Sequence, residues 1–347
     1  MAPPAPGEGR PAVRGRISRS HHRSPGDHAA VTLRGMVNID KPKGMTSFDV
    51  VRRIRRAAGI RKVGHAGTLD PNATGVLPVA VGEATRLVDE LMDTRKRYLA
   101  DVVFGVATDS YDIDGEVTEE HDASHLTAAA VTAALAPYRG EIMQRPPAFS
   151  AVKRAGVPAY TAARRGEPLD LEERPVTIYG VEVVEWDTSN PARPRAVLDV
   201  RCGKGFYVRS LAHDAGQTLG VGAHLSDLRR TQVGPFLAED ATPLDAAVAL
   251  LQAGEIERLV HAPDVVLAGW PAIILGSPDV ARIRQGMDIA VLPREGFLRG
   301  SQGPQARCYG PDGELLALLE PGSAPGTWHP FRVFPPEPQS QSAPSTR

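Results

Sequence analysis

The chain has 347 residues, of which 42% are hydrophobic and 23% charged, and its formal net charge is −1. This length predicts about two domains with substantial cores, and the near balance of charge excludes a uniformly basic nucleic-acid binder. Residues 1–62 nevertheless hold 14 of the 40 Lys and Arg residues but only 4 of the 41 Asp and Glu residues, which favours an N-terminal end that faces a polyanion.

Cysteine usage and hydropathy indicate the compartment. Cys202 and Cys308 lie far apart and have no metal-ligand spacing, as expected in a reducing compartment without a disulfide framework. No apolar run approaches the roughly 18 residues of a membrane span, and residues 1–28 lack the apolar core of a signal peptide. We therefore expect a soluble, cytoplasmic protein without membrane contact.

Residues 1–32 are rich in Pro, Gly, Arg and Ser. Such a segment cannot bury enough apolar surface to offset its ordering entropy, so we predict a disordered basic arm. His21, His22 and His28 have no further ligands around them and indicate a solvated tail rather than a metal site. The arm can add non-specific attraction for phosphates.

A short strand is expected at 35–40, followed by a turn and then a helix. The helix is predicted to start with a capping box at 46–49 and to end at Gly59. Its predicted apolar face has four residues at helical spacing: Phe48, Val51, Ile54 and Ala58. Three arginines without interleaved acids fall on another face: Arg52, Arg53 and Arg56. This favours phosphate contacts over an ordinary solvated face.

The stretch 63–77 is the segment around which the chain is organised. Its three glycines and one proline disfavour a regular helix or strand, and it runs into an apolar, strand-like segment at 76–81. A constrained loop of this kind can hold its one carboxylate, Asp70, in a fixed place. An Asp before a Pro is also a common turn former, and the residues alone leave both interpretations open.

The rest of the chain mixes helical and strand patterns without a regular βαβ series, which indicates an α+β fold with a mainly antiparallel mixed sheet flanked by helices. Further helices are predicted at 83–92, 126–138, 158–165, 210–219 and 244–253. Further strands are predicted at 97–107, 176–184, 195–202 and 228–233. The acidic segment 109–115 resembles a calcium loop but has His121 where such a loop needs Glu, so we predict a polar connection.

The C-terminal part has short apolar runs between Gly and Pro turns, with a hairpin signal at 311–313. We expect a main domain at 33–262, a small β-rich domain at 263–336 and a disordered tail at 337–347.

Four side chains could share one site: Asp70, Tyr98, Tyr207 and Arg209. If 206–209 is a strand, Tyr207 and Arg209 point to the same face. An Arg beside a buried Asp would keep the carboxylate ionised, and a Tyr could stack on a planar ring or handle a proton. Core tyrosines and a surface arginine are the ordinary alternatives.

Seven separated motifs, in order, resemble the bacterial tRNA pseudouridine synthases of the TruB type. They lie at 39–47, 64–71, 73–78, 96–98, 146–153, 203–209 and 222–230. The resemblance implies a pseudouridine-synthase core followed by a C-terminal PUA-like, RNA-binding domain, which the segment 281–286 matches loosely. It also implies conversion of uridine 55 in the tRNA T-loop to pseudouridine, by breaking the N1-glycosidic bond, turning the ring and rejoining it through C5. Because substrate and product are isomers, no cofactor or metal is expected.

The resemblance further implies the roles of single residues. Asp70 would be the nucleophile, attacking either the sugar or the base. Tyr98 would stack on the uracil and handle a proton, and Arg209 would pair with Asp70. The residues implied in substrate binding are Lys41, His65, Tyr207 and Leu228. Among them His65 would help to flip the nucleotide out of the T-loop, although without the resemblance a core histidine is the simpler interpretation.

The implied partner is the T-arm of tRNA, with Arg52, Arg53 and Arg56 on its backbone, and we expect a monomer that needs no protein partner. Two other functions were weighed. A catalytically silent RNA-binding protein would not need Asp70, Tyr98 and Arg209 together. A nucleosidase or glycosidase usually needs a second carboxylate, and no other acid lies near Asp70 within its motif.

Overall fold

The computed structural model describes residues 34–154, 156–167, 169–291 and 305–336. The predicted basic arm with its three histidines and the predicted tail at 337–347 lie outside the described residues.

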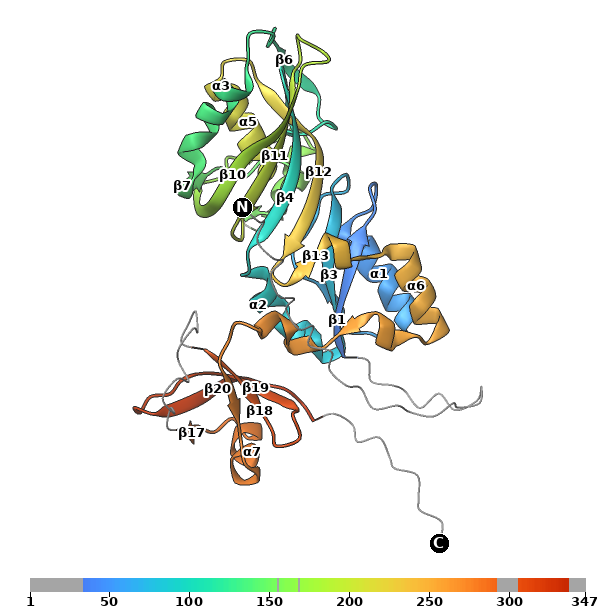
Figure 1. Ribbon diagram of the computed structural model, residues 1–347, viewed down its shortest axis with the longest axis vertical. Coiled ribbons are helices and arrows are strands. Elements are labelled where there is room, and N and C mark those ends of the chain that lie inside the picture. Colours follow the sequence, from blue (N-terminus) through green and yellow to red (C-terminus); the bar gives the residue numbers. More distant parts are fainter. Residues whose placement is uncertain (1–33, 155, 168, 292–304, 337–347) are drawn as a thin grey trace, which may run out of the picture. The chain divides into compact units, whose positions relative to one another are not determined.

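A mixed sheet of eleven strands forms the centre of the described chain, with its main path in the order β14-β1-β3-β12-β4-β11-β10-β7 (Figure 1). Pairing is antiparallel except between β1 and β14 and between β3 and β12, as expected for a mainly antiparallel mixed sheet. The strands on this path are β1 (Gly35–Lys41), β3 (Thr74–Val81), β4 (Lys96–Phe104), β7 (Gly140–Gln144), β10 (Arg174–Asp187), β11 (Arg195–Cys202), β12 (Ala223–Val233) and β14 (Thr242–Pro243). Three more strands join it from the side: β2 (Val63–His65), β13 (Phe236–Leu237) and β15 (Val260–His261).

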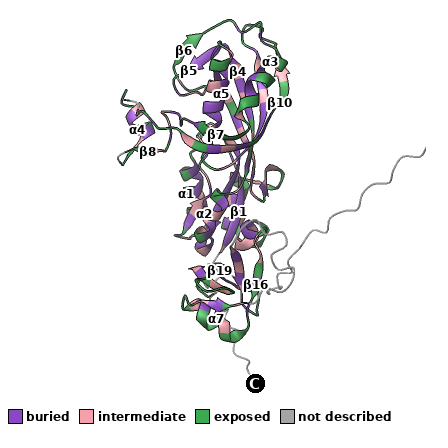
Figure 2. Ribbon diagram, turned by 90° about the vertical axis from the view of Figure 1, so that its left-hand side faces the viewer, coloured by how far each residue is buried: buried purple, intermediate pink, exposed green. Residues whose placement is uncertain are grey.

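Helices flank this sheet. Figure 1 shows α1 (Ser47–Ala58) beside α6 (Leu244–Ala253), and α3 (Ala128–Leu135) beside α5 (Val208–Thr218). The shorter helices of the sheet region are α2 (Val88–Met92) and α4 (Ala159–Ala163), with 3₁₀ turns η1 (Gly82–Leu87), η2 (Ala136–Tyr138), η3 (Ala238–Asp240), η4 (Ile256–Arg258) and η5 (Pro263–Leu267). Figure 2 shows that β1 is largely buried, whereas β6 (Val117–Glu120) is exposed. In the described part of the chain, no helix has the length and hydropathy that crossing a membrane requires.

Helix α1 begins and ends at the predicted residues. The side chain of Thr46 accepts from the Asp49 backbone, the Asp49 side chain accepts from the Thr46 backbone, and Gly59 ends the helix at a φ of 65°. The prediction for its apolar face is partly wrong, because Val50 is buried and Phe48 is 61% exposed. Residues two positions apart on a helix point about 200° away from each other. The helix face that buries Val50 therefore turns Phe48 to solvent.

Several element boundaries differ from the prediction. The central stretch is a loop only between β2 and β3, because 63–65 pairs with 79–81. The helix expected at 83–92 opens as the 3₁₀ turn η1. The strand expected at 97–107 breaks at Gly105, which has a φ of 92°, and β5 (Val106–Thr108) then pairs with β6. The edge strand β7 was not predicted, since its residues are mostly exposed and lack alternation.

The C-terminal part contains a second sheet, in the order β16-β18-β19-β20-β17, and the helix α7 (Ser277–Arg284). Its strands are β16 (Ala272–Ile274), β17 (Ile289–Ala290), β18 (Ala306–Tyr309), β19 (Leu315–Pro321) and β20 (Thr327–Val333). The predicted hairpin is confirmed by the antiparallel pairing of β18 with β19. The described residues are not divided further by their contacts, so a boundary near residue 262 stays a prediction.

Candidate active site

The loop between β2 and β3, residues 66–73, presents Asp70 to a buried arginine. The Asp70 Oδ2 lies 3.0 Å from Nε of Arg209. The Arg209 side chain is 6% exposed, whereas that of Asp70 is 45% exposed. The structure therefore brings together two residues that are far apart in the sequence, with the cation enclosed and the carboxylate open to a ligand.

Arg209 does not lie on a strand. It belongs to the first turn of α5, and Tyr207 is the residue that precedes the helix, so the expectation that both side chains share a strand face is wrong. The backbone enters the helix here because the Gln144 side chain bonds both the Tyr207 N–H, at 2.8 Å, and the Tyr207 carbonyl, at 3.0 Å. Arg209 then donates to the carbonyls of Ser110, at 3.1 Å, and Phe149, at 2.9 Å.

A second carboxylate, Asp112, shares the Arg209 guanidinium. Its Oδ2 lies 3.4 Å from Nη1 of Arg209, and its Oδ1 accepts from Ser110 Oγ at 2.6 Å. The neighbouring Tyr111, at a φ of 65°, stacks on His213 of α5 with ring centroids 3.8 Å apart. The sequence predicts only a polar connection at 109–115. The acidic composition of this segment was the one signal that it could contact Arg209.

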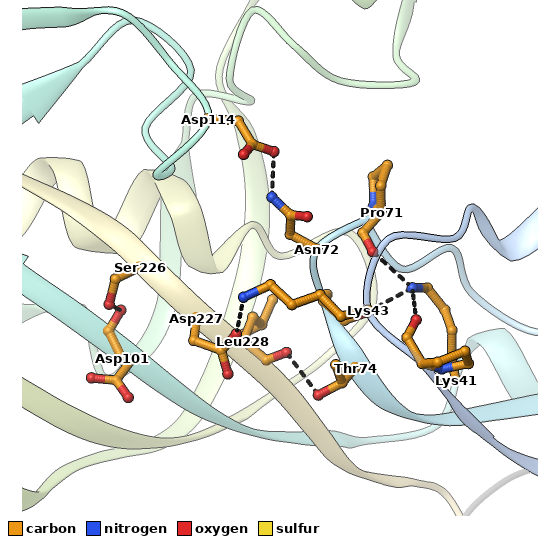
Figure 3. A network of polar contacts seen from close by, with 12 residues as sticks. Lys41, Lys43, Pro71, Asn72, Thr74, Asp101, Asp114, Ser226, Asp227 and Leu228 are labelled. Atoms are coloured by element: carbon orange, nitrogen blue, oxygen red, sulfur yellow. Dashed lines mark hydrogen bonds and ion pairs between the residues drawn. The ribbon is translucent and has the colours of Figure 1, made fainter. Parts of the chain in front are cut away.

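Lys41, the last residue of β1, holds the loop that carries Asp70 through hydrogen bonds to its backbone. Its buried Nζ donates to the carbonyls of Pro42, Pro71 and Ala73 at 2.9, 3.0 and 2.7 Å (Figure 3). Burial lowers the pKa of Lys41 to about 8, against the opposing effect of the nearby Asp70 carboxylate. With its donors taken by backbone carbonyls, Lys41 is placed to support the loop rather than to contact RNA.

The helix α1 fixes the same loop from another side. Ser47 Oγ accepts from the Leu69 N–H at 2.8 Å and lies 3.1 Å from the Leu69 carbonyl. On the solvent side, Asn72 donates to Asp114, as Figure 3 shows. Hydrogen bonds therefore hold the loop on both sides of Asp70, at Leu69 and at Asn72. This limits the positions open to the Asp70 carboxylate.

Tyr98 lies on β4, partly exposed and packed against the main core. Burial raises the pKa of its hydroxyl, Arg230 on β12 opposes that rise, and Asp70 adds to it. Leu228 lies on β12 opposite Ala100 of β4 and is buried. Tyr98 thus lies on the strand that pairs with the one carrying Leu228 and Arg230.

His65 ends β2 and is partly buried. Burial, and then the charge of Arg230, lowers the pKa of its imidazole, which favours the neutral ring. Its Nδ1 is enclosed without a hydrogen-bond partner among the described residues. The Tyr207 hydroxyl likewise forms no recorded hydrogen bond with the described part of the chain, which leaves both side chains available to a substrate.

Two of the three arginines on α1 that were predicted to contact phosphates are paired with acids, contrary to the sequence interpretation. Arg52 lies 2.7 Å from Asp49, and Arg53 lies 2.6 Å from Asp245 of α6. Both guanidinium groups remain substantially exposed. Arg56 is exposed and has no ion pair recorded among the described residues. The basic face of α1 is therefore partly neutralised.

Comparison with known proteins finds one consistent likeness. The model of the TruB family pseudouridylate synthase N-terminal domain matches residues 55–208, and that of the tRNA pseudouridylate synthase B C-terminal domain matches residues 209–262. The tRNA pseudouridine synthase B of Dehalococcoides mccartyi is 39% identical over 87% of this chain and 97% of its own length. That of Symbiobacterium thermophilum is 45% identical over 76% of this chain and 86% of its own length.

Solved structures agree with this likeness. A chain of a Cbf5-Nop10-Gar1 complex matches with a TM-score of 0.60 and 30% identity, over 82% of this chain and 78% of that one. A chain of an H/ACA RNP bound to a substrate RNA that contains 2′-deoxyuridine matches with a TM-score of 0.62 and 26% identity, over 87% of this chain and 85% of that one.

Proposed function

Because the chain belongs to the TruB family of pseudouridylate synthases, we propose that it converts the uridine at position 55, in the T-loop of tRNA, to pseudouridine, with Asp70 as the nucleophile. The observation that carries this proposal is the ion pair of Asp70 with Arg209, in which the arginine is buried and the acid is open to solvent. Arg209 engages Oδ2, and no hydrogen bond from the described residues is recorded to Oδ1. A carboxylate oxygen is thus free to attack.

The reaction exchanges one bond for another on the same ring. The bond from N1 to the sugar breaks, the uracil turns, and a bond from C5 to the sugar forms, while one proton leaves C5 and one is added at N1. Attack by Asp70 gives a covalent intermediate, which divides one difficult step into two easier ones. Tyr98 is proposed to stack on the uracil and to relay the proton.

The other candidate residues serve recognition of the nucleotide. His65, with an unpartnered Nδ1, is proposed to occupy the space that the flipped nucleotide leaves, which offsets part of the unstacking cost. Tyr207 and Leu228 are proposed to line the uracil site. Lys41 supports the loop from inside.

The tRNA backbone is proposed to lie along the exposed arginines of α1. Among the described residues Arg56 has no acid to displace, whereas Arg52 and Arg53 would exchange Asp49 and Asp245 for phosphates. The segment 263–336 is proposed to act as a PUA-like RNA-binding domain. We expect the protein to work as a monomer in the cytoplasm, without a protein partner.

A hydrolytic reaction is the second candidate, because Asp112 is a second carboxylate near Asp70. Both oxygens of Asp112 are already engaged, one by Arg209 and one by Ser110. A general acid or base must instead reach the substrate, so isomerisation is the better fit.

The test is chemical mapping of pseudouridine in a tRNA transcript after incubation with the purified protein. We expect pseudouridine at position 55 alone, and none in a matched transcript with cytidine there. Release of free uracil with an abasic tRNA would instead support the hydrolase, and pseudouridine at another position would refute the assigned site.

A further inference from the structure

Arg230, on β12, is the largest fully buried side chain in the described chain, at 1% exposure. Its neighbour Arg229 forms a two-pronged ion pair with Asp40, at 3.1 and 2.9 Å. Arg230 has no carboxylate within ion-pair distance among the described residues. An enclosed cation without an acid is costly, so other groups must compensate for its charge.

The groups that do so are two backbone carbonyls, one in the loop that carries Asp70 and one on β3, which follows it. Arg230 donates from Nε to the carbonyl of Val76 at 2.7 Å and from Nη2 to the carbonyl of Gly67 at 3.0 Å. These carbonyls lie on either side of Asp70 in the sequence. Together with the bonds that Lys41 makes inside the loop, two buried cations hold the backbone beneath the nucleophile.

The sheet register places Arg230 beside Tyr98 as well. Arg230 is paired with Gly75 of β3 on one side and with Tyr98 of β4 on the other. Side chains of directly opposed residues lie on the same face of a sheet. The guanidinium therefore faces both of the groups proposed to act on the nucleotide, the loop of Asp70 and the ring of Tyr98.

Two glycines allow the close approach of Arg230, one to its side chain and one to its backbone. Gly67 has a φ of 92°, and a Cβ there would lie 3.3 Å from Nη1 of Arg230. Gly75 has a φ of 97°, and a Cβ there would lie 2.2 Å from the Arg230 carbonyl oxygen. Both positions need glycine for conformation and for space.

We propose that Arg230 is a positioning residue for the isomerisation, which fixes the loop of Asp70 and faces Tyr98, so that it acts on the chemical step and not on tRNA binding. This inference rests on the proposed function. In the proposed relay Tyr98 donates its hydroxyl proton to N1 and then takes the proton that leaves C5, so between the two transfers it is a phenolate with one proton fewer. A fixed cation beside Tyr98 lowers the cost of that state without moving during the reaction.

The test compares Arg230→Met, which keeps the bulk and removes the charge, with Arg230→Lys, which keeps the charge and loses the fork of donors. Arg229→Met is the matched control on the same strand. The readouts are the single-turnover rate of pseudouridine formation at saturating tRNA and the dissociation constant for tRNA. They separate chemistry from binding.

For Arg230→Met we expect a rate about 100-fold lower, the scale of a misplaced catalytic group, with a tRNA dissociation constant within about three-fold of wild type. Arg230→Lys should recover part of the rate, and Arg229→Met should stay within about three-fold of wild type. A rate for Arg230→Met close to wild type, or a loss explained by weaker tRNA binding, would overturn the proposal.

Circular dichroism establishes whether each variant is folded. If Arg230→Met does not fold, Arg230→Lys decides: a folded variant that binds tRNA but is about ten-fold slower supports positioning, and one with the wild-type rate overturns it. If neither folds, the role is structural only and the proposal is wrong. Failure of wild type to form pseudouridine would refute the proposed function itself, a result distinct from equal rates in wild type and variant.

Discussion

Replacement of Arg209 by Met should separate the structural from the chemical part of the acid–arginine cluster. The guanidinium contacts Asp70 at 3.0 Å and Asp112 at 3.4 Å, and it satisfies the carbonyls of Ser110 and Phe149. The variant leaves Asp112 without its cation and both carbonyls without a donor.

The magnitude follows from burial. Asp112 is 23% exposed beside the enclosed Arg209, and removal of one member of a largely buried pair costs about 3 to 5 kcal/mol. Asp70 is nearly half exposed, so Asp70→Asn should change the free energy of unfolding by less than about 1 kcal/mol. The Arg209 guanidinium therefore has one contact that stabilises the fold, with Asp112, and one that is proposed to act in the reaction, with Asp70.

Equilibrium unfolding in urea measures both changes, with Asp112→Asn as a third variant. We expect Arg209→Met and Asp112→Asn to shift the midpoint clearly and Asp70→Asn to leave it nearly unchanged. Equal destabilisation by Asp70→Asn and Arg209→Met, or a loss of less than about 1 kcal/mol in Arg209→Met, would contradict this assignment of the two contacts.

Three further outcomes are expected. The folded-state pKa of Lys41 is lowered from 10.5 to about 8, so between these pH values the unfolded chain binds more protons than the folded one and the free energy of unfolding should rise with pH. Urea unfolding at pH 8 and pH 10 should show a smaller rise in Lys41→Met than in wild type. An equal rise in both proteins would contradict the assignment. Phe48→Ser should change the free energy of unfolding by less than about 0.5 kcal/mol, whereas Ile54→Ala on the buried face should cost about 2 to 5 kcal/mol; similar losses would mean that Phe48 is packed. Gly75→Ala should destabilise by about 1 to 3 kcal/mol, because its Cβ would meet the Arg230 carbonyl, and an unchanged melting temperature would show that the strands separate at low cost.

Local signals predicted the elements well. The helix at 244–253 and the strand at 195–202 have the expected ends, and the capping box of α1 forms as its residues suggest. These features depend on caps, turns and periodicity within a few residues. They can therefore be recognised without knowledge of the tertiary fold.

The site required contacts that no local pattern encodes. Arg53 pairs with Asp245 of α6, a helix that is far from α1 in the sequence. Arg209 pairs with Asp112, which is likewise far from it in the sequence. Arg230 could be recognised only from its burial and from the register of β12 with β3 and β4. The residue types suggested Asp70, Tyr98 and Arg209 as candidates and the family resemblance implied their roles, while strand pairing and burial were needed to identify what surrounds them.

The central claim is that the Asp70 carboxylate performs the isomerisation, and the most direct test is the single-turnover rate of pseudouridine formation at position 55 for wild type and Asp70→Asn. We expect the variant to bind tRNA with nearly wild-type affinity and to form no pseudouridine. Product formation by Asp70→Asn at a measurable fraction of the wild-type rate would contradict it.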